Sequence, residues 1–447
     1  AERLDEQIEL LAHHALQAEV WDKALRYLRQ AASKASSRWA FREAARYLEL
    51  ALEVIGRLPN RDEMAEQEID VRLELRMALM PAAQNSRITG IIQDAVALGE
   101  RIGDRRRLAL AYAYQAYGAI ELCDQPQAVE SAHRSLALAE EIGEPVLTLS
   151  ARHVLSQVYY TLGDFRQAIE VARPALEASE EIVIDALLKR TYAAIPFYLL
   201  HSRAEVGLFR EALLDAEIMM RRAEAAGHPF AIAVMGVGVG YMHVRRGVAA
   251  QAIPVLERSI KFCQTYSIDL QIPWAAACLG LAYAFTGRHE AAIEYAQEGV
   301  QRGEALGLTR FQPLRETFLA TAYLLAGRYE DALATARDAL ELARRYHERG
   351  PEAWALYWIA ESMAQLQGAE RNEIHDHYLA ALKLADELCM RPLVAHCHFG
   401  LGRLHAKDDQ REQAREHLAT ATTLYRDMDM RFWLEPAQAA LNEVGVQ

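Results

Sequence analysis

The segment GRHEAAIEYAQEGV, residues 287–300, has close counterparts at 163–176 (GDFRQAIEVARPAL), 207–220 (GLFREALLDAEIMM) and 327–340 (GRYEDALATARDAL). Each copy opens on Gly and carries Ala five positions later, and the same frame continues at Cys123, Gly247 and Asp409. From 123 to 327 these turn residues follow one another at intervals of 40 residues, or 44 in one case. A fixed period of about 20 to 50 residues is typical of repeat architectures. The sequence therefore predicts one repeated unit rather than several unrelated domains.

Each repeat is expected to consist of two antiparallel α-helices. Ala168, Ala172 and Ala175 follow a turn at helical spacing, so small side chains line one face of the second helix. Three further segments carry a Gly that can end a helix and a Pro that can open the next one. These segments are Gly143-Glu-Pro145, Gly227-His-Pro229 and Gly350-Pro351. The pattern predicts short, tight connections between helices.

The order of Leu279, Gly280, Tyr283, Gly287 and Ala292 resembles the tetratricopeptide repeat, or TPR. This resemblance implies an all-α fold, a right-handed superhelix (α-solenoid) of about ten antiparallel TPR-like helix pairs with a period near 40 residues. Residues 1–60 are expected to form N-terminal helical entry repeats. Residues 61–447 are expected to continue them as one extended domain, within a fragment of a larger protein.

Both ends of the chain resemble the C-terminal helical arm of large bacterial signalling proteins. The resemblance is carried by DEQIELLAHHALQAEVWDKALRYLRQAASKA from residue 5 and by ELCMRPLVAHCHFGLGRLHAKDDQREQAREHLATATTLYRDMDMRFW from residue 387. In that family of class III adenylate or guanylate cyclases and P-loop signalling ATPases, catalytic domains often precede the repeats. The resemblance implies that this chain is a sensor or scaffold arm.

Charge and hydropathy argue against two classes of partner, nucleic acids and membranes. The formal net charge of −13 places a negative field around the protein, which would repel the phosphate backbone of a nucleic acid. No apolar run reaches the length that crosses a bilayer, and the first residues lack the layout of a signal peptide. We expect a cytoplasmic protein that binds neither nucleic acid nor membrane, and the sequence does not fix its oligomeric state.

Motifs for catalysis and cofactor binding are missing from the sequence. It contains no GxxxxGK[ST] phosphate loop and no GxSxG nucleophile elbow. His396-Cys397-His398 is the group most suggestive of a metal site, but neighbours one and two positions apart on a helix do not converge. We therefore expect no enzymatic activity, no cofactor and no metal in this chain.

Function is instead expected on the concave wall of the superhelix, which the first helix of each pair lines. The repeat phase places nine candidate ligand- or partner-binding residues there: His153, Gln157, Tyr160, Phe197, His201, Tyr241, Arg245, Trp274 and Phe285. Aromatic rings interleaved with polar groups suit a protein or peptide ligand, possibly the upstream domains of the same polypeptide. Equally, several of these side chains could pack against a neighbouring helix.

Two functions from different classes remain open. The first is a regulatory, protein-binding solenoid that gates an attached signalling module. The alternative is a small-molecule-sensing superhelical domain, as in inducer-binding transcription activators. A deep apolar pocket ringed by Trp274, Tyr241 and Phe197 would favour the sensor, whereas an open polar groove would favour peptide binding.

Overall fold

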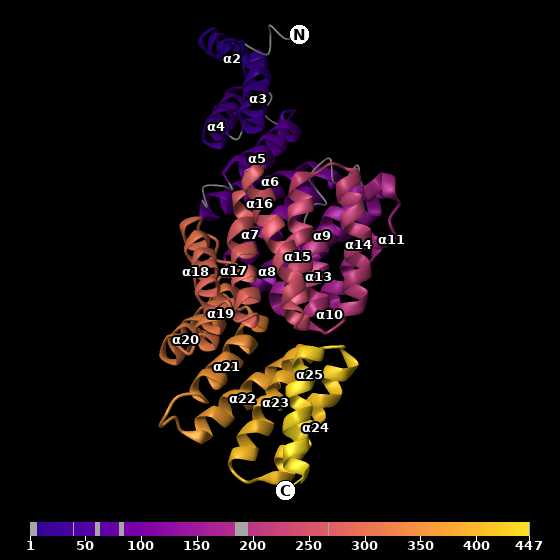
Figure 1. Cartoon of the computed structure of the whole chain (residues 1–447). Coiled ribbons are helices and arrows are strands. Elements are labelled where there is room, and N and C mark those ends of the chain that lie inside the picture. Colours follow the sequence, from indigo (N-terminus) through magenta and orange to yellow (C-terminus); the bar gives the residue numbers. More distant parts are fainter. Residues whose placement is uncertain are drawn as a thin grey trace. The chain divides into compact units, whose positions relative to one another are not determined.

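The computed structural model describes residues 7–38, 40–58, 63–79, 85–183, 195–266 and 268–446, and within these ranges it contains helices and no β-strand (Figure 1). The chain divides into two compact units, residues 1–154 and 155–447. Helix α9 (Pro145–Leu162) crosses the division. The domain boundary predicted at residues 60 and 61 lies outside the described residues, and it stays a prediction.

The first unit is a stack of helix pairs. Its helices are α2 (Ile8–Gln17), α3 (Trp21–Ser37), α4 (Phe41–Arg57), α5 (Ala65–Leu79), α6 (Asn85–Ile102), α7 (Arg105–Glu121), α8 (Gln125–Ile142) and the first part of α9. An aspartate side chain caps the N-terminus of two of these helices, α7 and α8. Asp104 accepts a hydrogen bond from the Arg107 amide at 3.0 Å, and Asp124 accepts one from Gln127 at 3.2 Å. Such caps satisfy amides that have no partner inside the helix.

The second unit continues the same plan from the end of α9. Its helices are α10 (Phe165–Ala172), α11 (Pro174–Glu177), α13 (Ile195–Glu205), α14 (Phe209–Ala225), α15 (Pro229–Arg246), α16 (Ala249–Thr265), α17 (Ile272–Phe285), α18 (His289–Ala305), α19 (Gln312–Leu325), α20 (Tyr329–Arg345), α21 (Arg349–Met363), α22 (Arg371–Glu387), α23 (Arg391–Lys407), α24 (Arg411–Asp427) and α25 (Arg431–Val446), with the 3₁₀ turn η2 (Asp269–Gln271) before α17. Counted over both units, the described helices make ten antiparallel pairs, from α3 and α4 to α23 and α24. The prediction of about ten TPR-like pairs in an all-α solenoid is confirmed.

Residues in the left-handed backbone region mark the turns between helices about every 20 residues. The turn residues expected from the repeat frame are all among them: Cys123, Gly163, Gly207, Gly247, Gly287, Gly327 and Asp409 have φ between 57° and 88°. Gly143 and Gly227 also have positive φ, and α9 and α15 start two residues later at Pro145 and Pro229. These turn predictions are confirmed.

The prediction for Gly350-Pro351 is wrong for Gly350, although Pro351 does lie in the first turn of α21. Gly350 lies inside the first turn of α21, and the left-handed residue is His347, with φ of 55°. Gly350 has a different structural role, because a Cβ atom there would lie 2.9 Å from the Phe165 ring. The sequence pattern identified a constrained glycine but assigned the wrong constraint.

Small residues allow the two helices of a pair to approach closely, as the repeat pattern predicted. A Cβ atom on Gly280 of α17 would lie 2.7 Å from the Ala296 nitrogen and 2.8 Å from the Ala292 oxygen of α18. Real Cβ atoms do not come this close to backbone atoms. The glycine is therefore required for α17 and α18 to pack at this distance.

Inner and outer helices alternate in the second unit. Helices α15, α17, α21 and α23 are buried almost all round, whereas α16, α18 and α20 bury a narrow stripe, which consists of alanine alone in α20. A helix that is buried on every side lies within a core rather than on a surface. The first helix of each pair therefore lies on the inside of the curve, as the repeat phase predicted.

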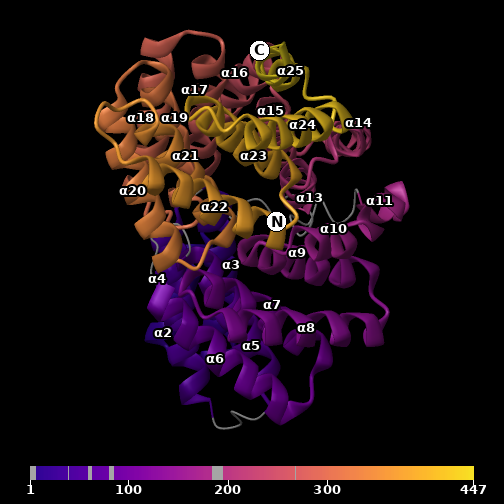
Figure 2. The ribbon, with the colours of Figure 1, turned by 90° about the horizontal axis from the view of Figure 1, so that it is seen from below.

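The curve of the second unit brings its last repeats against its first ones (Figure 2). A Cβ atom on Gly207 would lie 3.1 Å from Met428 Cγ, and one on Gly247 would lie 2.9 Å from Trp433 Nε1. Arg246 forms an ion pair with Asp429. We call these contacts between the turns after α13 and α15 and the start of α25 the closure contacts. They leave the inner helices enclosed.

Candidate functional site

Six of the nine predicted binding residues meet in one cluster inside the second unit. They are Tyr160, Phe197, His201, Tyr241, Arg245 and Trp274, and each is at least 92% buried. We call this group, together with Glu205 and Trp354, the inner cluster. Its members come from α9, α13, α15, α17 and α21. The repeat phase placed them along the concave wall, and in this structure their side chains are buried against one another.

His201 is the centre of the aromatic part of the inner cluster. Its ring stacks on Phe197 at 3.8 Å between centroids and on Tyr241 at 4.3 Å. Its Nδ1 lies 2.7 Å from the Phe197 carbonyl oxygen, and the Trp274 indole donates to Nε2 at 3.1 Å. Burial lowers the pKa of His201 to about 3, so the imidazole is neutral. Nδ1 then donates and Nε2 accepts.

A buried ion pair forms the polar part of the inner cluster. Arg245 Nε lies 3.3 Å from Glu205 Oε1, and the two side chains are only 5% and 3% exposed. The Tyr241 hydroxyl donates to the same carboxylate, and the Trp354 indole donates to Oε2 at 2.9 Å. The Arg245 guanidinium also lies over the Trp354 ring, 3.8 Å from its centroid. Removal of one partner from such a pair leaves an uncompensated buried charge.

Glu205 and Trp354 were missed by the sequence prediction, although the repeat register contained a signal for both. Glu205 precedes Arg245 by 40 residues, just as His201 precedes Tyr241 by 40. Trp354 follows Trp274 by two such periods. Equivalent positions in successive repeats lie on neighbouring inner helices, so an acidic residue one period before an arginine predicts an ion pair.

The other three predicted residues are not members of the inner cluster. His153 is half-buried and belongs to the first unit. Gln157 is 1% exposed, and its side-chain nitrogen has no hydrogen-bond partner among the described residues. Phe285 is half-buried and packs edge-on against Trp433 of α25, at 5.3 Å between ring centroids. Their assignment as binding residues stays a prediction.

A small cavity borders the inner cluster. Its volume of about 10 Å³ is room for one water molecule. The lining residues are Val244, Arg245, Leu281, Phe285, Trp354, Tyr357, Trp358, His396 and Trp433. Trp274 and Phe197 do not line it, and their rings pack 6.4 Å apart, with Tyr241 5.7 Å from Trp274. The deep pocket that would favour a sensor is therefore filled by the rings that were expected to surround it.

The residues of the His396-Cys397-His398 segment have separate environments. His396 Nδ1 lies 2.7 Å from the Tyr425 hydroxyl, whereas His398 Nδ1 lies 2.9 Å from His417 Nδ1. Cys397 is fully buried. Among the described residues, no three His, Cys, Asp or Glu side chains are arranged to hold a metal ion.

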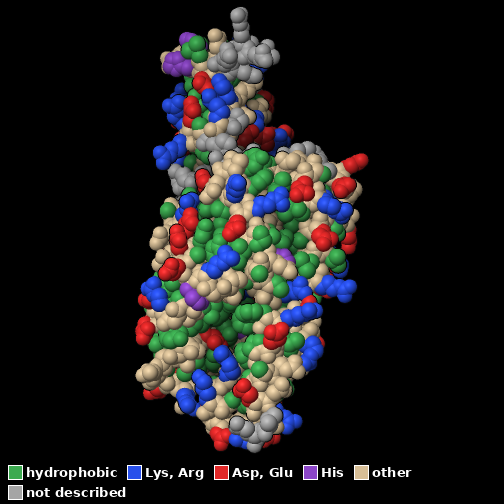
Figure 3. Space-filling view, viewed as in Figure 1, with side chains coloured by type: hydrophobic (Ala, Val, Ile, Leu, Met, Phe, Trp, Pro, Cys, Tyr) green, Lys and Arg blue, Asp and Glu red, His purple; other side chains and the backbone are tan. Residues whose placement is uncertain are grey.

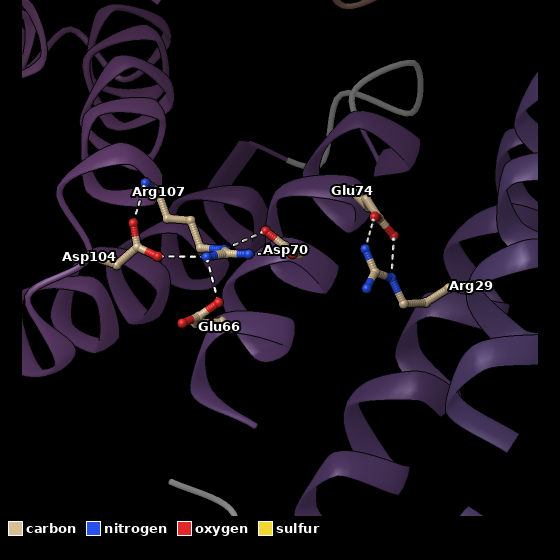
Figure 4. Close-up of polar contacts among 6 residues, drawn as sticks. All are labelled: Arg29, Glu66, Asp70, Glu74, Asp104 and Arg107. Atoms are coloured by element: carbon tan, nitrogen blue, oxygen red, sulfur yellow. Dashed lines mark hydrogen bonds and ion pairs between the residues drawn. The ribbon is translucent and has the colours of Figure 1, made fainter. Parts of the chain in front are cut away.

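The first unit contains a ladder of ion pairs along its inner helices α3, α5 and α7. Figure 4 shows its members, Arg29, Glu66, Asp70, Glu74, Asp104 and Arg107. Arg107 contacts three carboxylates at 2.6 to 2.9 Å, and Arg29 binds Glu74. Burial alone would raise the pKa of Asp104, but hydrogen bonds from Arg107 lower it below its ordinary value. The ladder ties successive repeats together through their inner helices.

The surface is of mixed charge. On the face drawn in Figure 3, acidic and basic side chains are interspersed among hydrophobic ones. In the part of the chain that the structure describes, no helix is both long and apolar enough to span a membrane.

Family models of the tetratricopeptide repeat match four stretches of the chain, residues 148–183, 279–302, 316–338 and 395–420. The second of these stretches begins at Leu279, the first residue of the sequence pattern that resembles the tetratricopeptide repeat. No curated protein sequence matches the chain significantly.

Several solved structures have a similar fold. A Rap protein in complex with competence and sporulation factor is 14% identical, with a TM-score of 0.59, covering 86% of this chain and 99% of that one. Aspartyl phosphate phosphatase F from Bacillus subtilis is 12% identical (TM-score 0.48; 79% and 91% covered). A signal transduction ATPase with numerous domains and a tetratricopeptide repeat sensor, from Pyrococcus horikoshii, is 15% identical (TM-score 0.45). The match covers 85% of this chain and 54% of the ATPase.

Proposed function

We propose that this tetratricopeptide-repeat region is a non-catalytic protein-binding solenoid that regulates a signalling module attached to it. Tetratricopeptide repeats along the chain support a scaffold that binds protein or peptide. The resemblance of both chain ends to the arm of signalling cyclases and ATPases supports an attached module. The partner is a domain of the same polypeptide or a separate protein.

The observation that carries the proposal is the enclosed inner cluster. A Glu205–Arg245 ion pair lies buried among aromatic rings, with Tyr241 and Trp354 donating hydrogen bonds to the carboxylate. Replacing a buried ion pair by packed apolar residues is often neutral or stabilising, so such a pair is poorly explained by stability alone. A role in recognition or switching accounts for polar groups on the wall where TPR solenoids bind their ligands.

Partner binding at this wall requires the second unit to open. The closure contacts are small: an ion pair at Arg246 and Asp429, with side chains 21% and 50% exposed, and the packing of Phe432 and Trp433. Exposed ion pairs contribute at most about 1 kcal/mol. We infer that the second unit also has an open state, in which the closure contacts and the bond from Trp354 to Glu205 are broken, and that a partner which binds this state shifts the balance between the two.

The test is a titration of this region with the remaining signalling domains of its natural polypeptide, followed by hydrogen exchange. We expect saturable binding and faster exchange in α13 and α15 in the complex, because these helices lose their cover. Absence of binding, or binding with unchanged exchange in both helices, contradicts regulation through the inner cluster.

For the alternative, a small-molecule-sensing superhelix, the cavity found among the described residues is too small. Ligand sites for drug-sized molecules have volumes of about 300 to 1,000 Å³, far above the cavity beside Arg245. A whole small ligand does not fit inside the closed unit. Protein binding is therefore the better-supported function.

A further inference from the structure

The cavity beside the inner cluster contains two hydrogen-bond donors that the protein itself does not satisfy. Arg245 Nη2 and Trp433 Nε1 are both buried, and neither has a hydrogen-bond partner among the described residues. Both side chains line the cavity, one from α15 and the other from α25. Arg245 is only 6% exposed. Buried donors in proteins are nearly always paired, so this combination points to a missing acceptor.

The groups around Arg245 show why the acceptor is not supplied from within. Glu205 faces Arg245 Nε, and its two oxygens already receive the Tyr241 hydroxyl and the Trp354 indole. His396, on the other side of the cavity, is engaged with the Tyr425 hydroxyl through Nδ1. Burial lowers the pKa of His396 to about 3, so it adds no second positive charge. Arg245 is therefore the cation that an incoming anion would meet.

A partly exposed group of aromatic rings adjoins the cavity, which Phe285 and Trp433 line. Phe285, Phe432 and Trp433 form a three-ring group with centroid distances of 4.9 to 6.1 Å. Phe432 is 46% exposed, and the other two rings are half-buried. In Figure 3 the surface is hollowed between α17, α21 and α25, the helices that carry these rings and part of the lining.

We propose that this cavity is a binding site for a carboxylate carried by an apolar, preferably aromatic, group. One carboxylate oxygen enters the cavity and accepts hydrogen bonds from Arg245 Nη2 and Trp433 Nε1. The apolar body remains outside and lies on Phe285 and Phe432. The size of the cavity, room for one water-sized group, fits an oxygen atom and excludes the rest of the ligand.

Two sources supply such a carboxylate, a free small organic acid and the C-terminal residue of a peptide. The inference goes beyond the proposed function and does not depend on it, because the cavity is present while the second unit stays closed. Carboxylate binding is measured on this region alone, so its outcome is distinguished from that of partner binding, which would separate Trp433 from Arg245.

The experiment follows the indole N–H resonances of the six tryptophans during titration. The probes are 3-phenylpropionate and its amide, and the peptide Gly-Gly-Phe with a free or an amidated C-terminus. We expect a carboxylate probe to shift the Trp433 resonance in a saturable way while Trp21, in the first unit, stays unchanged. The matching amide should bind roughly tenfold more weakly, because it lacks the charge that strengthens the bond to Arg245. The free acid or the free peptide end, whichever binds more tightly, identifies the source.

Two variants test whether the Trp433 N–H takes part in binding. Arg245→Gln leaves Glu205 without its partner and can fail to fold, so the main variant is Trp433→Phe, which removes the N–H and keeps a ring. We expect roughly tenfold weaker carboxylate binding to Trp433→Phe, measured on the remaining indole resonances, and no change for the control Trp21→Phe. An unshifted Trp433 resonance with all four probes, equal binding of acids and amides, or full affinity in Trp433→Phe overturns the proposal and leaves the cavity to a water molecule.

Discussion

Trp354→Phe tests whether the inner cluster is held by its hydrogen-bond network. The wild-type indole donates to Glu205 Oε2 at 2.9 Å, and Trp354 is only 3% exposed. Phenylalanine keeps an aromatic ring but removes the donor, so one oxygen of a buried carboxylate loses its partner. A hydrogen bond to a charged group contributes about 1.5–3 kcal/mol. We expect the free energy of unfolding to fall by that amount beyond the effect of the smaller ring.

Trp358→Phe is the matched control for ring size. Trp358 lies one helical turn further along α21 and is 6% exposed, and it is not among the residues that hydrogen-bond to Glu205, which are Tyr241 and Trp354. Thermal unfolding of the two variants isolates the hydrogen bond. At about 2–4 °C per kcal/mol for a unit of this size, Trp354→Phe should melt roughly 3–12 °C below Trp358→Phe. Equal melting temperatures would refute the claim that the network stabilises the closed second unit.

Three further changes test the packing, the ion-pair ladder and a buried acid. Gly280→Ala should lower the free energy of unfolding by about 1–3 kcal/mol in denaturant, because the added Cβ collides with α18. The control Gly56→Ala, with no atom within 4 Å of the added Cβ, should be neutral or stabilising. Equal effects of the two changes would contradict the close approach of α17 and α18. Arg107→Ala should lower the free energy of unfolding more at low salt than at high salt, because salt screens the ion pairs that it removes. The control is the exposed Arg105→Ala, which removes the ion pair with Glu141 and should cost less. The same dependence on salt in both variants would count against the ladder. Burial and neighbouring carboxylates raise the pKa of Glu316 to about 7, so the folded state holds an extra proton between about pH 4.5 and 7, and stability should fall as pH rises through that window. Glu316→Gln should therefore unfold at higher denaturant than the wild type at pH 8 and at a similar concentration at pH 5; a constant difference across this range would show that the acid is not buried in its neutral form.

Much of the local structure could be predicted because each repeat reuses the same short-range rules. The Gly at 163, 207, 247, 287 and 327 recurs because the turn needs a left-handed residue that most side chains disfavour. The same register placed His201, Tyr241, Arg245 and Trp274 on inner helices, and it even contained the Glu205–Arg245 pair. Local signals were sufficient for these features.

The closure of the second unit could not be predicted in the same way. Its curvature is the sum of small rotations between successive helix pairs, and no single residue specifies that sum. The contact of Gly163 with Leu388, whose Cδ2 would lie 3.0 Å from an added Cβ, joins residues more than 200 positions apart. Sequence reasoning left open whether the concave wall forms a deep pocket or an open groove, whereas the structure packs its residues against one another.

The central claim, that a partner reaches the inner cluster when the closure contacts open, is tested most directly by Asp429→Arg. This change replaces the ion pair with Arg246 by repulsion, and Asp331→Arg, at an aspartate of equal side-chain exposure paired with Arg328 on the outer helix α20, is its control. Affinity for the attached signalling domains should rise in Asp429→Arg and stay at the wild-type value in Asp331→Arg, because a larger open fraction lowers the apparent dissociation constant. Unchanged or weaker binding by Asp429→Arg, with its fold intact, would contradict the claim.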